Sequence, residues 1–281
     1  MSVLIIAYLC GVFPLLLGAM GKHFLKKTTL PIYVMGHAIQ FAVLSLCGVL
    51  INFTKLSILS FARGYLVVSI VVGIFCVILT CREWKGNLPA WKPSLWNVII
   101  LLGELGMMGG SILLLMPHWL DLTEESLYQL SVTGQLDDMG VLLYGMMQQL
   151  TGMNPVTLVR VFLPLFLLPL FYATYHYLAK GRVWFLIFAY IIFGMFIFVP
   201  GYLPLEVFLN VWNPATLVVS VFLPLFYVSL VGRSYVNLAI VALAMVGLMP
   251  TVWVYMVALA IVYIGMRIGY RIYDKKGGAQ E

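Results

Sequence analysis

The feature that most constrains this chain is a succession of apolar segments, all but the short eighth one close to the length that crosses a bilayer. A membrane-spanning helix needs about 20 apolar residues. Such segments lie at roughly 2–20, 30–51, 64–80, 96–116, 155–178, 183–200, 214–231, 236–249 and 251–268. Only 9% of the 281 residues are charged, whereas a soluble domain carries about 25%. The sequence therefore predicts an all-α, polytopic transmembrane helix bundle.

The number of spans depends on the last two apolar segments. Pro250 follows Met249 at their junction, and a proline there is compatible with a tight hairpin between two helices. The alternative is one long helix over 236–268 that is kinked at the proline. We expect nine spans from the first arrangement, and the second would give eight.

The positive charges predict the orientation of the bundle. All 16 Lys and Arg residues except Lys55, Arg63 and Arg160 fall on one side of the nine-span layout, and cytoplasmic loops carry such an excess. We therefore expect an external N-terminus and a cytoplasmic C-terminus. Because the charges sit at the ends of apolar segments, the basic composition does not indicate nucleic-acid binding.

This layout makes residues 1–281 a single integral membrane domain. It comprises four N-terminal spans (1–116), an external acidic loop (117–154), five C-terminal spans (155–270) and a cytoplasmic tail (271–281). Two stretches of the loop, "DLTEESLYQL" and "MGVLLYGMMQQLTG", have the pattern of short amphipathic helices. We expect these helices to lie on the outer membrane surface or to dip into its interface.

Two segments of the chain share one motif: "NPVTLVRVFLPLF" at 154–166 and "NPATLVVSVFLPLF" at 213–226. Asparagine is a favoured helix N-cap, and proline is favoured at the first helical position. The pattern predicts that Asn154 and Asn213 each cap a helix that starts on the external side and runs inward. The prolines at 164 and 224 interrupt the backbone hydrogen bonds of these helices, so the kinked faces should point into the bundle.

Two capped helix starts that open toward one external cavity would suit a phosphate group. Helix N-termini present unsatisfied N–H groups and a partial positive charge, and Arg160 lies shortly after the first start. An arginine at that depth is costly unless it is paired, snorkels or binds an anion. The alternative is that Asn-Pro only starts the helices and that Arg160 reaches lipid headgroups.

The external loop contains the adjacent acids Glu124 and Glu125. One interpretation is structural: Asp121, followed three residues later by Glu124, matches a capping box. The other is functional, because adjacent carboxylates above a cavity that contains an arginine could bind a divalent cation or act as a general base.

The region from 121 to 178 resembles the external loop of bacterial multi-pass proteins with GT-C glycosyltransferase-like architecture. In those proteins an acidic pair is followed by a tyrosine, a Thr-Gly turn and a Leu-rich helix that contains a proline. The matching residues here are Glu124, Glu125 and Tyr128, then Thr133-Gly134, Gly152-Met153-Asn154-Pro155 and Leu163-Pro164-Leu165. Residues 211–225 also resemble a later segment of that family.

The resemblance implies a polyprenyl-phosphate sugar donor, an external acidic residue as base or metal ligand, and transfer outside the cytoplasm. Under it, Glu124 and Glu125 are the catalytic candidates, and Arg160, Asn154 and Asn213 would bind phosphate. The chain departs from the family in having Glu-Glu in place of Asp-Asp, a contracted loop after Tyr128 and no large external domain. A non-catalytic scaffold subunit that packs against other membrane proteins is therefore an alternative.

Other polar residues fall within the apolar segments. Glu104 lies near the middle of the fourth segment and His37 in the second, and either could belong to a small transporter or channel. Hydrogen bonding to a neighbouring helix is the structural alternative for both residues, and for Gln40, one turn after His37. Gly106 and Gly110 form a GxxxG pair, which predicts close packing against another helix or subunit.

Overall fold

The structure is a computed structural model. In the part of the chain that it describes, all regular secondary structure is helical. The described residues are 2–54, 57–84, 102, 139–154, 157–182, 184–187 and 214–277, and no β-strand occurs among them. The all-α prediction is therefore confirmed for these residues. The predicted segments at 96–116 and 183–200 lie largely outside them.

The N-terminal part contains three long helical rods. The first is continuous through α1 (Ser2–Ala7), the π-helical turn η1 (Tyr8–Val12) and α2 (Phe13–Phe24). The second is α3 (Ile32–Thr54), and the third is α4 (Ile58–Trp84).

The remaining elements follow α4 in chain order. They are α7 (Met139–Thr151), η2 (Leu158–Phe162), α9 (Leu163–Ala179), α12 (Pro214–Leu217), η4 (Val218–Phe222), α13 (Leu223–Val231), α14 (Tyr235–Leu248), η5 (Pro250–Val252) and α15 (Trp253–Gly277). The turns η2 and η4 are π-helical, whereas η5 is a 3₁₀ turn.

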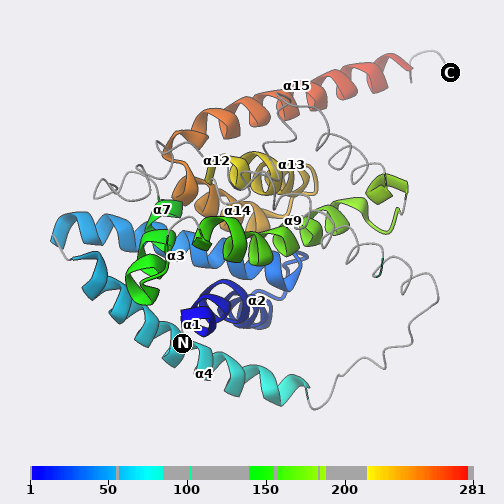
Figure 1. The fold of residues 1–281 in the computed structure, drawn as a ribbon. Helices are drawn as coiled ribbons and strands as arrows, with labels where there is room; N and C mark the ends of the chain where they lie inside the picture. Colours follow the sequence, from blue (N-terminus) through cyan, green and yellow to red (C-terminus); the bar gives the residue numbers. More distant parts are fainter. Residues whose placement is uncertain are drawn as a thin grey trace.

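Helix α3 lies at the centre of the bundle, between α2 and α14 (Figure 1). Glycines allow α3 to lie close to both α2 and α14. A Cβ atom on Gly36 would overlap the carbonyl oxygen of Pro14, and one on Gly18 would overlap that of Ile32. On the other side, a Cβ on Gly247 would lie 2.9 Å from the carbonyl oxygen of Phe41. Small residues permit this backbone-to-backbone packing.

The outermost helices present apolar residues to their surroundings. Helices α4 and α15 lie on opposite edges of the molecule in Figure 1, and exposed residues include Val67, Val71 and Ile78 on α4 and Ile261 and Ile264 on α15. Among the described residues, three helices are long and apolar enough to cross a membrane: Ser2–Phe24, Ile58–Thr80 and Pro214–Val231. Several shorter apolar helices accompany them, so the architecture is compatible with a membrane helix bundle.

The chain forms two helices, not one kinked helix, in the region 236–268. Helix α14 ends at Leu248, and Met249 has extended backbone angles (φ −147°, ψ 101°). A 3₁₀ turn then leads into α15. The break at the Met249-Pro250 junction is therefore confirmed.

Helix α7 packs against other helices of the bundle. It coincides with the second expected amphipathic helix and contacts α1, α3 and α4, and its position at the membrane interface stays a prediction. Leu142, Leu143, Met146 and Met147 are at most 2% exposed. The apolar face that suggested an interfacial helix is thus buried against other helices. The first expected helix lies outside the described residues.

Candidate functional site

The two copies of the repeated motif adopt the same irregular structure. In the first copy, residues Leu158–Phe162 form a π-helical turn, and one residue separates it from Pro164. In the second, Val218–Phe222 form the corresponding turn before Pro224. π-Helical turns are rare and are frequently found at functional sites. The repeat therefore specifies a defined backbone irregularity in addition to apolar composition.

The structure contains a third example of this arrangement that the sequence analysis missed. Residues Tyr8–Val12 form a π-helical turn, and Pro14 follows it after one intervening residue. The sequence "VFPLL" at 12–16 lacks one leucine of the "VFLPLF" pattern and has no Asn-Pro start. The shared signal is a Val-Phe pair shortly before a proline.

Each π-helical turn leaves backbone carbonyls without their usual partners. The N–H of Phe13 donates to the carbonyl of Tyr8, five residues back, and not to that of Leu9. Pro14 has no N–H with which to reach the carbonyl of Cys10. Two adjacent carbonyls in the first rod must therefore find other donors, because an unpaired buried carbonyl is costly.

Two side chains of α3 supply these donors. Gln40 Nε2 donates to the carbonyl of Leu9 at 2.9 Å. The Tyr33 hydroxyl lies 3.1 Å from the carbonyl of Cys10 and 2.8 Å from that of Phe166 in α9, so it bridges two of the proline-containing rods. In the helix that runs through α12, η4 and α13, the carbonyl of Ser220 accepts a hydrogen bond from the Tyr175 hydroxyl of α9 at 3.1 Å. The interhelical hydrogen bonding expected for Gln40 is therefore confirmed.

His37 lies on the same face of α3, between Tyr33 and Gln40. It is 1% exposed, and neither ring nitrogen has a hydrogen-bond partner among the described residues. Its ring instead packs edge-on to Tyr33 and is stacked with Phe41, at centroid distances of 4.6 and 5.8 Å. The interhelical hydrogen bond expected for His37 is therefore wrong within this part of the chain, because aromatic rings surround the imidazole.

Asn154 and Arg160 are the candidate phosphate-binding residues that the structure places. The carbonyl of Asn154 accepts the N–H of Leu158 at 3.0 Å, which is compatible with an N-cap position. The backbone of Arg160 is the third residue of η2. The corresponding residue of η4 is Ser220, whose hydroxyl donates to the carbonyl of Thr216. The two copies thus share a backbone form but carry different side chains at this position.

The other predicted site residues lie outside the described residues. They are Glu124, Glu125, Asn213, Glu104, Gly106 and Gly110. Within the described ranges, no cluster of three or more His, Cys, Asp or Glu side chains could hold a metal ion.

A second polar cluster, which the sequence analysis did not identify, joins three separate parts of the chain. Asn237 of α14 is fully buried, accepts a hydrogen bond from Thr28 at 2.7 Å and donates one to Thr29 at 3.0 Å. The Thr29 hydroxyl also lies 2.7 Å from the Tyr177 hydroxyl of α9. This cluster fixes the α2–α3 connection against α9 and α14.

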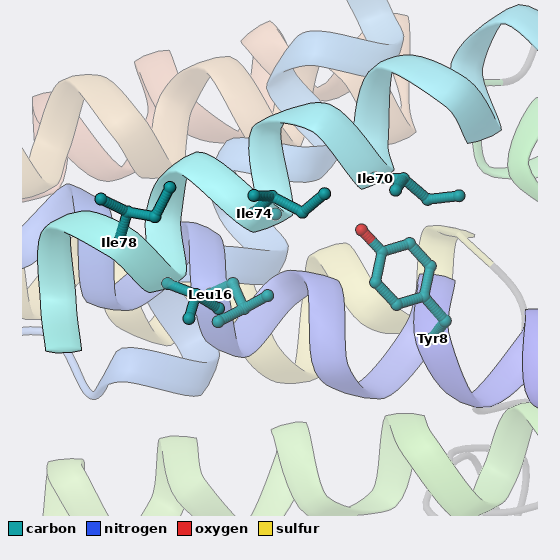
Figure 2. Close-up of a pocket in the computed structure, with 7 residues that line it drawn as sticks. Tyr8, Leu16, Ile70, Ile74 and Ile78 are labelled. Atoms are coloured by element: carbon teal, nitrogen blue, oxygen red, sulfur yellow. The ribbon is translucent and has the colours of Figure 1, made fainter.

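Two apolar hollows flank α4. A groove of about 290 Å³ lies between the first rod and the part of α4 from Ile70 to Ile78. Figure 2 shows Leu16 and Ile74 on its two walls and the Tyr8 ring at one end. The Tyr8 hydroxyl donates to the carbonyl of Ser69 at 2.6 Å, and Gly73 leaves room for it. A larger cavity, of about 510 Å³, lies between α2, α3 and the first half of α4.

Comparison with known proteins found no matching family model, no matching curated protein and no matching solved structure.

Proposed function

We propose that this protein is a GT-C-like membrane protein that handles polyprenyl-phosphate-linked sugars outside the cytoplasm, in the assembly of cell-envelope glycoconjugates. It crosses the bacterial cytoplasmic membrane nine times, with its N-terminus outside. Arg160 binds the lipid phosphate, with the helix starts at Asn154 and Asn213 beside it. Glu124 and Glu125 provide the general base or hold a divalent cation.

The observation that carries this proposal is the position of Arg160. It belongs to a π-helical turn that begins four residues after Asn154, so its backbone lies close to the start of an apolar helix. A guanidinium near such a start is stabilised by an anion. The N–H groups of a helix start also favour phosphate. The equivalent position in the second copy is Ser220, so the proposed site is asymmetric and has one cationic anchor.

Binding of a polyprenyl phosphate to the full chain in lipid nanodiscs tests the proposal. The Arg160→Gln variant should bind the lipid about ten-fold more weakly, because loss of about 1.4 kcal/mol from one charged contact corresponds to that factor. Arg63→Gln is the matched control, since Arg63 is exposed near the start of α4 and is assigned to the same side of the membrane. Equal binding by all three proteins would contradict the proposal.

The acidic pair is tested separately. Glu125→Gln should abolish transfer of the sugar while the polyprenyl phosphate remains bound, because the substitution removes a base and leaves Arg160 intact. If the wild-type protein binds no such lipid and instead co-purifies in fixed stoichiometry with other membrane proteins, the scaffold function replaces the enzymatic one.

A further inference from the structure

The larger cavity beside α4 has an elongated shape. Its lining runs along α4 from Ser60 to Val72, a rise of about 18 Å at 1.5 Å per residue. Helices α3 and α2 also line the cavity, for example through Cys47 and Met20. The volume, about 510 Å³, lies within the range of about 300–1,000 Å³ that is typical of small-molecule sites.

The described walls of the cavity do not suit an ionised ligand. None of the described residues that line the cavity is Asp, Glu, Lys, Arg or His. Most of the lining side chains are aliphatic or aromatic, and the polar ones carry only hydroxyl, thiol or amide groups. An ion in such surroundings would lack a partner. An apolar cavity also tends to remain dry, so a hydrocarbon suits it better than water does.

Gln40 and Tyr65 are among the residues that line the cavity, and both carry hydrogen-bonding groups. Gln40 is fully buried, and its Nε2 is held by the carbonyl of Leu9, which fixes the orientation of the amide. Its Oε1 then has no donor among the described residues. The neighbouring Tyr65 hydroxyl accepts from Gln40 Nε2 at 3.4 Å, and this bond leaves the hydroxyl's own hydrogen for another acceptor.

We propose that this cavity binds the hydrocarbon chain of an uncharged lipid alcohol, with the alcohol hydroxyl beside Tyr65 and Gln40. The hydroxyl of an alcohol both donates and accepts. It can donate to Gln40 Oε1, which has no other donor in the described part of the chain, and accept from the Tyr65 hydroxyl. The chain lies against Leu17, Met20 and Val72. Helix α4 and the rod Ser2–Phe24 are long and apolar enough to cross a membrane, which places the cavity within reach of membrane lipids. This site is independent of the sugar-lipid function proposed above.

Photo-crosslinking of the full chain in nanodiscs tests the site, with a long-chain fatty alcohol that carries a diazirine as the probe. We expect saturable labelling that maps to residues around Tyr65 and is displaced by the unlabelled alcohol. A straight-chain alcohol and a branched isoprenoid alcohol, used as separate competitors, distinguish the two sources of such a chain. A fatty acid of the same length should compete poorly when ionised, because no described residue of the walls carries a positive charge.

Two glycine variants provide a matched pair for this experiment. A Cβ at Gly64, in the cavity, and one at Gly265, on α15, would each meet nothing within 4 Å. Gly64→Leu should fill the cavity and lower saturable labelling about ten-fold, equivalent to 1.4 kcal/mol, whereas Gly265→Leu should leave it unchanged. Labelling that does not saturate, or that the fatty acid displaces equally well, would overturn the proposal. The competition arm uses the wild-type chain, so the test does not depend on the folding of either variant.

Discussion

At the scale of single residues, the hydrogen bonds of the Tyr33 hydroxyl can be removed by one substitution that changes nothing else in the side chain. The hydroxyl lies between the carbonyls of Cys10 and Phe166, and Pro14 removes the N–H that would otherwise reach the first of these. Tyr33→Phe should therefore lower the free energy of unfolding by about 1–2 kcal/mol, because buried carbonyls lose a donor. Thermal or denaturant unfolding in a mild detergent measures the change.

Tyr255→Phe is the control for this substitution. It removes the same hydroxyl from α15, where Tyr255 is 46% exposed, and it should change the stability by less than about 0.5 kcal/mol. If the two substitutions change the free energy of unfolding equally, the bridging role of Tyr33 is wrong. The Tyr33 hydroxyl would then contribute no more to stability than an exposed hydroxyl does.

At the scale of helices, the crossing of α2 and α3 depends on the absence of a side chain at Gly36. A Cβ there would overlap the carbonyl oxygen of Pro14, and backbone atoms cannot rotate away as a side chain can. Gly36→Ala should therefore destabilise the protein by about 1–3 kcal/mol or more through overpacking. Gly145→Ala in α7 is the comparison, because a Cβ at Gly145 meets nothing within 4 Å.

The two alanine substitutions should have opposite signs. Alanine is favoured over glycine within a helix by about 0.5–1 kcal/mol, so Gly145→Ala should stabilise while Gly36→Ala destabilises. Unfolding midpoints of the two variants and of the wild-type protein, measured in the same detergent, test this difference in sign. Equal stabilisation by both would show that α2 and α3 can separate without cost.

The elements differ in how far the sequence alone predicts them. Apolar length and proline position predict the helices, the break at Met249 and the equivalence of the two Asn-Pro repeats, because these depend on local chemistry. The third π-helical turn was missed because residues 12–16 lack the Asn-Pro start. The burial of α7 and the hydrogen bonds of Gln40 depend on which helices meet, and periodicity carries no information about that.

The candidate site is less predictable than the fold for the same reason. The sequence singled out His37 as a polar residue in an apolar segment, but the Tyr33 and Phe41 rings that surround it become its neighbours only through the position of α3. Gln40 and Tyr65 are 25 residues apart in the chain, and they meet because α3 and α4 both pack against α2.

At the scale of the whole molecule, the orientation of the bundle is the central expectation. The nine-span layout places the turn at Ser234 in the cytoplasm and the turn at Thr251 outside, with α14 crossing between them. Single cysteines at these positions, in a chain whose four native cysteines are replaced by serine or alanine, should react with a membrane-impermeant maleimide from opposite sides. Thr251 is exposed in the 3₁₀ turn, so its cysteine variant should be accessible.

The comparison of intact cells with inside-out vesicles separates the possible topologies. Thr251→Cys should be labelled in cells, and Ser234→Cys only in inside-out vesicles. Labelling of both from the cytoplasmic side would mean that α14, which has 14 residues, does not cross. At 1.5 Å per residue it spans about 21 Å, which is shorter than the hydrocarbon core of about 30 Å. Its crossing therefore requires the flanking residues, or local thinning of the bilayer, to make up the difference, and the labelling of Thr251→Cys tests this requirement directly.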